Sequence, residues 1–401
     1  MSGDEFAGRV GSLKPDLLGV SAMSPTWLPI AERLARLREV RSEIPVLVGG
    51  YQAILNPEET INHAGVNFVC VGEGEIPLVR LISRLQGIGP EGQAIPGLWE
   101  KQDGGRVIRT EPVLTPELSP DNLPDYSIFA RHYGLRHWCQ YGVESTRLLN
   151  LPVITGRGCP YRCSYCNNTS LLQIYQGKGR YLRKYDPERL VSELVQLRDQ
   201  YAVEYFQFWD EMFLYDLGYA RRLLDDYRRR VRLPFSMFAH VEKMEADFCR
   251  SAALAGCHSM WFGVESGSEE YRRRYLYRTM SNQQIRAASE NARQAGIKRM
   301  IFNMFGMPFE TREDMVSTLE LTKEIDPERA VFIQYLPLPG TPLYRLAQES
   351  DLLLEQSSER QMWELGHLNV RQHPGAATSQ DVREMAAWVA DYNAKHNRLD
   401  Y

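Results

Sequence analysis

The chain lacks the features of membrane, secreted and nucleic-acid-binding proteins. No apolar run approaches the roughly 20 residues that a membrane-spanning helix needs, and the N-terminus has no basic segment followed by an apolar one, as a secretory signal would. With 47 Lys and Arg against 51 Asp and Glu, the net charge is −4, so a nucleic-acid-binding footprint is not expected. The arginine runs at 228–230 and 272–274 are interpreted as solvated helix faces.

Cysteine is scarce, and its placement is uneven. The 401 residues include seven cysteines, an odd number, and three of them fall within a single short stretch. This argues against a disulfide framework and favours a reducing compartment with a metal or redox site. Together with 43% hydrophobic and 24% charged residues, it indicates a cytoplasmic globular enzyme that acts on a small molecule and binds neither membrane nor nucleic acid.

The first 147 residues show two different patterns. In residues 1–90, strand and helix patterns alternate, which indicates a parallel sheet with strands at Asp16–Ser21, Val46–Val48 and Asn67–Val71. Residues 91–147 are rich in proline and contain a predicted hairpin at Leu98–Thr110. We interpret this second region as a linker between two domains.

Residues 148–345 alternate more regularly. Helical segments separate the strands expected there, which are Leu149–Ile154, Val203–Trp209, Phe235–His240, Ser259–Val264, Met300–Phe305 and Val331–Leu336. This order predicts an α/β fold with a partial (β/α)6 TIM-type barrel, whose active site lies at the C-terminal ends of the strands. Residues 346–401 carry helix signals and are predicted to form a C-terminal helical tail or lid.

The stretch Gly156–Asn168 (GRGCPYRCSYCNN) directly follows the first barrel strand. Cys159, Cys163 and Cys166 have the spacing C-x3-C-x2-C, and thiolates suit zinc or iron–sulfur clusters. A closed zinc site needs four ligands, but the next cysteine is Cys249. Iron–sulfur cubanes are normally held by four thiolates. Three cysteines therefore predict a [4Fe–4S] cluster with one iron open to another ligand.

This spacing, with Tyr165 before the last cysteine, resembles the signature of the radical SAM superfamily. The resemblance implies that S-adenosylmethionine (SAM) chelates the open iron and that an electron from the cluster cleaves it. The product is a 5′-deoxyadenosyl radical, which abstracts a hydrogen from the substrate. An electron donor, such as a flavodoxin, a ferredoxin or a dedicated reductase, is implied as well.

Later segments resemble the subgroup that carries an N-terminal cobalamin-binding domain. In Phe208–Phe213, Asp210 or Glu211 would bind the SAM ammonium group, although either acid could simply cap a helix. In the GVESGS segment that begins at Gly263, Glu265 and Ser266 would reach the methionyl or ribose groups. In Asn303–Thr311, Phe305 and Met307 would contact the adenine, and core packing is the alternative for both.

Two residues are candidates for contact with the substrate. His240 stands at the end of the third strand, where an arginine is common in the subgroup, and it is otherwise a satisfied core histidine. Tyr215 follows the acidic pair and is a hypothetical hydrogen-atom or proton donor. The acids Asp210, Glu211 and Asp216 would suit a polycationic aminosugar.

Residues 1–90 resemble only the second part of a cobalamin-binding Rossmann-like domain. Pro15–Pro25 and Val46–Gly50 match it, whereas two strands, a helix and the D-x-H-x-x-G motif are missing. So small a domain would bury a corrin poorly, so cobalamin is doubtful here. Ser21, Gly49 and Gly50 are interpreted as relics of the fold.

These observations predict a truncated Rossmann-like domain followed by a radical SAM barrel that uses the deoxyadenosyl radical directly. The chain resembles enzymes that dehydrate or deoxygenate a sugar diol in aminoglycoside antibiotic biosynthesis. One alternative is a cobalamin-dependent radical SAM methyltransferase or cyclase whose recorded start lies too late. Another is a non-catalytic zinc or iron–sulfur scaffold, which would not cleave SAM.

Overall fold

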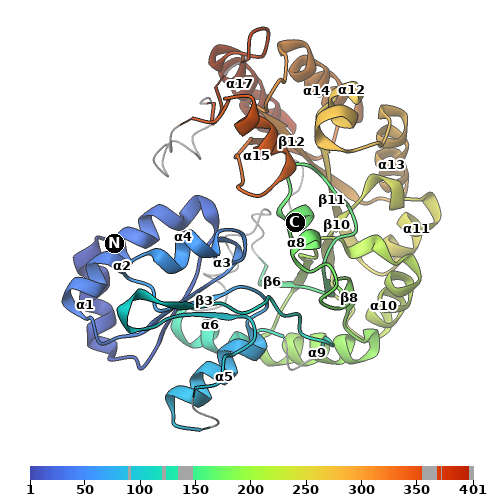
Figure 1. Ribbon diagram of the computed structural model, residues 1–401. Coiled ribbons are helices and arrows are strands. Elements are labelled where there is room, and N and C mark those ends of the chain that lie inside the picture. Colours follow the sequence, from blue (N-terminus) through green and yellow to red (C-terminus); the bar gives the residue numbers. More distant parts are fainter. Residues whose placement is uncertain (89–91, 120–122, 134–147, 355–367, 372, 397–401) are drawn as a thin grey trace.

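The computed structural model describes residues 1–88, 92–119, 123–133, 148–354, 368–371 and 373–396. Two α/β units lie side by side, a smaller N-terminal unit and a larger one built on a curved sheet (Figure 1). Within these residues, no helix combines the length and apolarity that crossing a membrane requires.

The N-terminal unit contains a five-stranded sheet in the order β1-β2-β3-β4-β5. Its strands are β1 (Leu18–Ser21), β2 (Val46–Gly49), β3 (Phe68–Cys70), β4 (Leu98–Lys101) and β5 (Val107–Ile108). The first three are parallel, as predicted, and β4 and β5 are antiparallel. The hairpin is therefore part of this sheet, and our interpretation of it as part of a linker was wrong, because β4 pairs directly with β3.

Helices cover this sheet and carry its connections. They are α1 (Gly3–Leu13), α2 (Trp27–Val40), α3 (Tyr51–Leu55), α4 (Pro57–Asn62) and α5 (Glu75–Leu85). Sequence analysis missed α1, although Ser2 and Glu5 form a capping box at its start. β1 is an edge strand of this sheet, and half-buried and exposed residues alternate along it.

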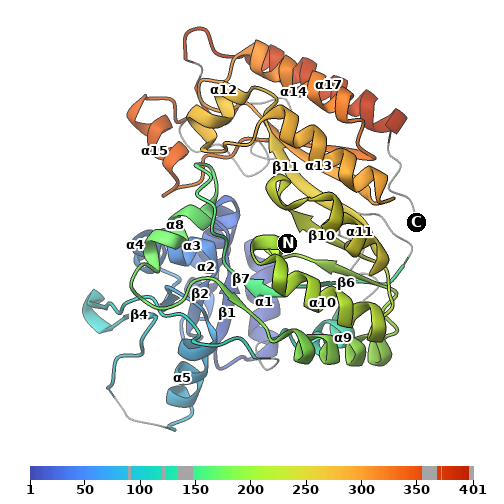
Figure 2. The same ribbon diagram turned by 90° about the vertical axis from the view of Figure 1, so that its right-hand side faces the viewer.

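The larger unit is a curved parallel sheet in the order β13-β12-β11-β10-β9-β6. Its strands are β6 (Asn150–Val153), β9 (Tyr205–Phe208), β10 (Phe235–Ala239), β11 (Cys257–Glu265), β12 (Lys298–Phe305) and β13 (Arg329–Gln334). The main crossover helices are α9 (Pro187–Tyr201), α10 (Leu217–Arg230), α11 (Ala246–Leu254), α13 (Asn282–Gln294) and α14 (Arg312–Ile325). They lie on the outer face of the sheet (Figure 2) and enclose the main core, so the predicted partial barrel is confirmed.

Shorter elements lie around the barrel mouth and its ends. They are α6 (Tyr126–Tyr133), the small hairpin β7 (Gly156–Arg157) and β8 (Arg183–Lys184), α8 (Asn167–Ile174), α12 (Glu269–Tyr271) and α15 (Pro342–Glu349). The last helix, α17 (Ser379–His396), packs on the outer face of the barrel, where the Trp388 ring lies 6.4 Å from Phe332 of β13. It supplies the helix that follows the sixth strand.

Candidate functional site

The three predicted cysteines lie on one loop between β7 and α8. Cys159 is buried, Cys163 and Cys166 are half-buried, and all three are free thiols. Burial raises the pKa of Cys159 to about 12 and that of Cys166 to about 11, so a bound metal is needed to hold them as thiolates. No group of three His, Cys, Asp or Glu in the described part of the chain already has metal-site geometry. The donor set, three thiols on one loop, still fits a cubane with an open iron.

Several barrel segments hold this loop in place. The backbone N–H of Cys166 donates to Cys163 O at 3.1 Å. Ser164 N donates to Leu276 O at 3.2 Å, and Ser164 O accepts from Leu343 N at 2.9 Å. The loop is therefore tied to the barrel near both α12 and α15.

A buried arginine that sequence analysis missed lies beside the cysteines. Arg278 is only 8% exposed. It donates to Gly263 O at 2.6 Å and contacts Tyr165 Oη at 3.4 Å and Cys163 Sγ at 3.6 Å. Its Nε has no partner among the described residues. Burial alone would lower the pKa of Arg278, but Tyr165, Cys163 and Glu265 raise it above its ordinary value, so the guanidinium stays charged.

Glu265 lies in the same cluster. Its side chain is buried, which raises its pKa, while Arg278 and Tyr165 act in the opposite direction. Its backbone is left-handed, with a φ of 70°. A Cβ at Gly263 would lie 2.0 Å from Glu265 Oε1, so glycine is required there to make room for this carboxylate.

Ser266, the next residue of the same segment, lies inside the protein. It is fully buried, and its Oγ accepts from Ser268 N at 3.3 Å. Its carbonyl accepts from Arg272, which also donates to Met280 O at 3.0 Å. Arg272 is itself fully buried, so our interpretation of the run 272–274 as a solvated face was wrong at this position.

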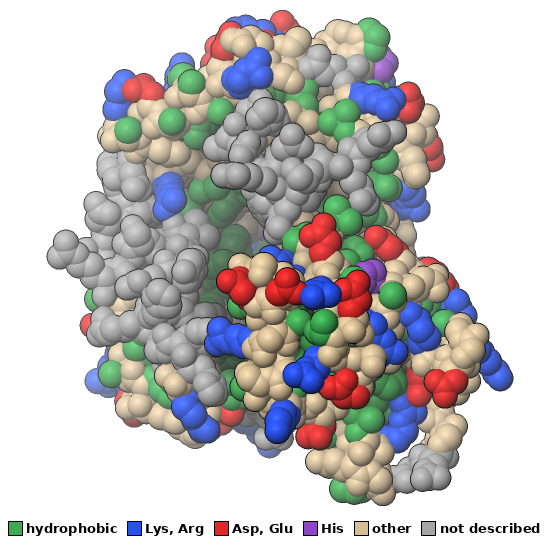
Figure 3. All heavy atoms as spheres, turned by 90° about the vertical axis from the view of Figure 1, so that its left-hand side faces the viewer, with side chains coloured by type: hydrophobic (Ala, Val, Ile, Leu, Met, Phe, Trp, Pro, Cys, Tyr) green, Lys and Arg blue, Asp and Glu red, His purple; other side chains and the backbone are tan. Residues whose placement is uncertain are grey.

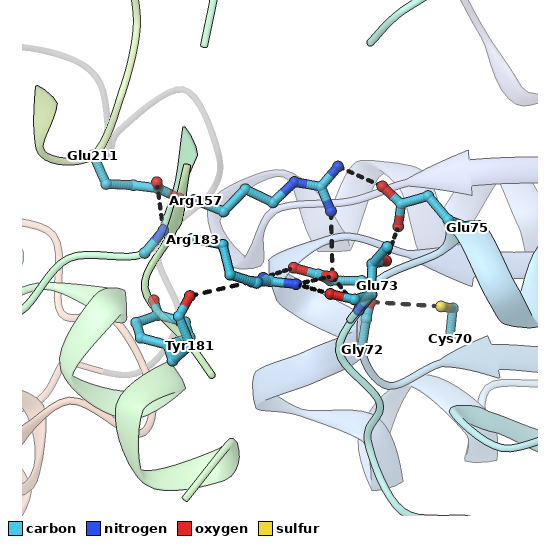
Figure 4. A network of polar contacts seen from close by, with 10 residues as sticks. Cys70, Gly72, Glu73, Glu75, Arg157, Tyr181, Arg183 and Glu211 are labelled. Carbon is cyan, nitrogen blue, oxygen red and sulfur yellow. Dashed lines mark hydrogen bonds and ion pairs between the residues drawn. The ribbon is translucent and has the colours of Figure 1, made fainter. Parts of the chain in front are cut away.

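The two acids after β9 have different environments. Asp210 is buried and accepts from Thr155 N at 2.9 Å, Thr155 Oγ1 at 2.6 Å and Lys184 Nζ at 3.0 Å. Glu211 faces the cysteine loop and accepts from Gly158 N at 3.1 Å (Figure 4). Its side chain keeps contact with solvent, yet its surroundings raise its pKa by desolvation. Of the pair, Glu211 is the one placed to meet a ligand.

Replacing Asp210 with asparagine is expected to lower the free energy of unfolding by about 3–5 kcal/mol, because a buried Lys184 ammonium would lose its counter-ion. The Lys184 and Asp210 side chains are 8% and 1% exposed. Urea denaturation measures the loss. Asp225→Asn, which breaks an ion pair with about half of each side chain exposed, should cost at most about 1 kcal/mol. Equal losses of unfolding free energy in Asp210→Asn and Asp225→Asn would show that the Lys184–Asp210 pair is not a buried ion pair.

The remaining predicted residues lie at different depths. The His240 ring stacks on Tyr161 of the cysteine loop, 3.9 Å between centroids. Burial lowers the pKa of His240 to about 3, so it is neutral. Tyr215 is half-buried with its ring 5.0 Å from Lys184 Nζ. Phe305 and Met307 are 4% and 3% exposed and lie in two separate apolar clusters.

A network of ion pairs joins the N-terminal unit to the base of the cysteine loop (Figure 4). Glu73 accepts two hydrogen bonds from Arg183 of β8 and lies 3.3 Å from Arg157 of β7. Arg157 also pairs with Glu75, and Thr115 N donates to Glu73 at 2.6 Å. Sequence analysis did not single out Glu73 or Glu75. Since Arg157 stands two residues before Cys159, the network ties the N-terminal unit directly to the cysteine loop.

Two cavities lie on either side of α3, between the two units. One is lined by Gly50, Tyr51 and Gly72 of the N-terminal unit and by Gly158 and Glu211 of the barrel. The other is lined by Ser24, Gln52 and Asn56 of the N-terminal unit and by residues 336–339 of the barrel. Both border residues that follow the parallel strands β1, β2 or β3. This is the edge at which open α/β sheets bind ligands.

Each of the two units matches a known protein family. Residues 1–82 match the B12 binding domain and residues 153–322 match the Radical SAM superfamily. The chain is 26% identical over 357 residues to an uncharacterized methyltransferase of Pyrococcus horikoshii, covering 87% of this chain and 73% of that protein. It is 23% identical over 429 residues to the cytidylyl-2-hydroxyethylphosphonate methyltransferase of Streptomyces wedmorensis, covering 99% and 78%.

Solved structures share the fold. The cobalamin-dependent radical enzyme OxsB superposes with a TM-score of 0.69 at 16% identity, over 98% of this chain and 60% of that one. The methyltransferase TsrM from Kitasatospora setae gives 0.65 at 20% identity, over 86% and 67%. The chain therefore contains a B12-binding domain followed by a radical SAM domain, and it shares its fold with these two structures.

Proposed function

We propose that this protein uses SAM and cobalamin together to transfer a methyl group to a small molecule. The observation that carries the proposal is the pair of cavities flanking α3, which open between the C-terminal edge of β1–β3 and the barrel mouth. A ligand placed there would lie between the N-terminal unit and the cysteine loop. The relatives named as methyltransferases support this choice of reaction.

Cobalamin was doubtful from the sequence because half a domain offers too little surface for a corrin. The N-terminal unit, however, forms only one wall of the candidate cobalamin site. In the structure, the barrel forms the second wall of both cavities, and the hairpin β4–β5 widens the sheet on the side of β3. Two walls can enclose a ligand that one wall cannot.

The side chains around the loop suit a charged, SAM-sized ligand. When bound, the cluster and cobalamin would supply the one-electron and methyl-transfer chemistry. Arg278, whose Nε lacks a partner within the described residues, would bind the methionyl carboxylate. Glu265 or Glu211 would accept hydrogen bonds from the ammonium group. His240 is neutral, so it would add no second positive charge near Arg278.

The test is the fate of SAM in protein reconstituted with iron and sulfide under anaerobic conditions, with dithionite as reductant. We expect S-adenosylhomocysteine to form when hydroxocobalamin is supplied and not to form without it. Formation of 5′-deoxyadenosine alone, at the same rate with and without cobalamin, would contradict methyl transfer.

Direct use of the deoxyadenosyl radical is the second candidate. It is favoured by the ion pairs of Glu73, which occupy part of the gap between β3 and the cysteine loop. An aminosugar as its substrate is not favoured, because two of the three expected acids are engaged. Asp210 binds Lys184 and Thr155, and Asp216 caps α10 by accepting from Tyr219 N at 2.9 Å.

A further inference from the structure

The inner face of the barrel sheet carries an aromatic surface that the SAM chemistry leaves unused. Side chains alternate across a strand, and those of Met237, Phe262 and Phe332 pack into the core under the helices. Their neighbours Phe238 and Trp261 therefore point to the other face of the sheet. They form a separate apolar cluster there with Met300, Phe302 and Val331.

The rings of this surface contact one another across four strands. Trp209, directly after β9, lies 5.9 Å from Phe238 of β10 and 6.3 Å from Trp261 of β11, both edge to face. Phe238 lies 5.1 Å from Trp261 and 5.9 Å from Phe302 of β12. The contacts fix the rings relative to each other, as a preformed binding surface requires.

Part of this surface is open to solvent. Trp209 is 41% exposed and Ile333 of β13 is 43% exposed. The Trp209 ring is nevertheless held, because its Nε1 donates to Gln207 Oε1 at 2.9 Å. Figure 3 shows hydrophobic side chains inside a hollow beside the N-terminal unit, whose own surface mixes acidic and basic groups. An exposed tryptophan fixed by a hydrogen bond and by ring contacts is suited to stack against a ligand.

The aromatic surface adjoins the residues of the candidate site along the chain. Trp209 immediately precedes Asp210 and Glu211, and Phe238 stands two residues before His240. Trp261 likewise stands two residues before Gly263, which accepts from Arg278. Trp209 directly follows β9 and Phe238 is the next-to-last residue of β10, so both lie at the C-terminal strand ends, where barrel enzymes bind substrates, whereas Trp261 lies in the middle of β11.

We infer that this aromatic surface binds the substrate, and that the substrate carries a flat apolar ring system. Stacking and edge contacts with Trp209 and Phe238 would recognise such a ring, whereas a sugar would leave its hydroxyl groups without partners against these side chains. The inference rests on the proposed function for the reaction that follows, but the binding step can be measured by itself.

The experiment follows fluorine NMR signals in the presence of the cluster-reconstituted full-length protein. The probes are 5-fluoroindole and 2-deoxy-2-fluoroglucose. We expect saturable broadening of the 5-fluoroindole signal and none of the sugar signal. Trp209→Leu should weaken indole binding roughly tenfold. Phe238→Leu, which removes the half-buried ring 5.9 Å from Trp209, should weaken it as well and guards against misfolding of the first variant.

Trp388→Leu is the matched control, because this half-buried tryptophan lies on α17 on the outer face of the barrel. It should leave 5-fluoroindole binding unchanged. Saturable binding of the sugar, no binding of the indole, or equal indole binding in the Trp209→Leu and Trp388→Leu variants would overturn the inference. Because none of these outcomes depends on turnover, a failure here is distinguishable from a failure of methyl transfer.

Discussion

Replacing Cys163 with alanine is expected to abolish reductive cleavage of SAM completely. A cubane held by three thiolates cannot lose one and still present a single open iron to SAM. The loop would remain in place, because its ties to the barrel use backbone atoms of Ser164 and Leu276. Iron analysis and the visible spectrum of the reconstituted protein measure the loss of the cluster, and chromatography of the SAM products measures the loss of activity.

Cys257→Ala provides the control for this experiment. Cys257 is a buried thiol on β11 outside the loop and donates to Ser259 O at 3.5 Å, so its removal should leave the iron content at about four per chain. Cys159→Ala and Cys166→Ala should behave like Cys163→Ala. Full iron content and normal SAM cleavage in any of the three loop variants would show that the loop does not hold the cluster.

Glu73→Gln is expected to weaken the junction between the two units strongly. The change leaves Arg183, whose side chain is 5% exposed, with a neutral partner in place of the carboxylate. Removing one partner of a buried ion pair typically costs about 3–5 kcal/mol. We expect a lower free energy of unfolding and, because Arg157 adjoins the loop, faster loss of iron to a chelator. Urea denaturation and the rate of iron release measure the two effects.

The effect of Glu73 should also depend on pH. Burial alone would raise the pKa of Glu73. Hydrogen bonds from Arg183 and Thr115 and the charge of Arg157 lower it by more, so its pKa lies below the ordinary value of 4.5. A carboxyl group whose pKa is lower in the folded than in the unfolded protein stabilises the fold at pH values above its unfolded-state pKa. This stabilisation is lost as the pH falls through the folded-state pKa. The wild type should therefore lose stability below about pH 4.5 more steeply than Glu73→Gln.

Glu58→Gln is the matched control for both measurements. Glu58 pairs with Arg109, but the two side chains are 55% and 48% exposed, so its loss should cost at most about 1 kcal/mol. Iron release at the wild-type rate in Glu73→Gln would show that the N-terminal unit does not position the loop.

Local patterns predicted the barrel well because they depend on residues close in sequence. The strand expected at Phe235–His240 is β10 (Phe235–Ala239), and the one expected at Met300–Phe305 is β12 (Lys298–Phe305). The cysteine motif identified its loop for the same reason. Asp103-Gly104-Gly105 likewise predicted a hairpin, but nothing local indicates that β4 pairs with β3.

The features that were missed depend on contacts between distant segments. Arg278 has no motif of its own, and only the fold brings it to Cys163, 115 positions earlier in the chain. Arg272 belongs to an arginine run that is typical of a solvated helix, yet it is buried because Ser266 O and Met280 O lie within its reach. The ion pairs between Glu73 and the β7–β8 hairpin join two units whose relative placement cannot be derived from either sequence pattern.

Electron paramagnetic resonance of the reduced, reconstituted protein tests whether cobalamin and the cluster bind next to each other between the two units. Both the reduced cluster and Co(II) cobalamin are paramagnetic, so neighbouring sites broaden or split each other's signals. We expect such an interaction in the wild type and its loss, with the cobalt signal retained, in Cys163→Ala. A spectrum that is the plain sum of two independent signals, or a protein that retains no cobalamin, would contradict it.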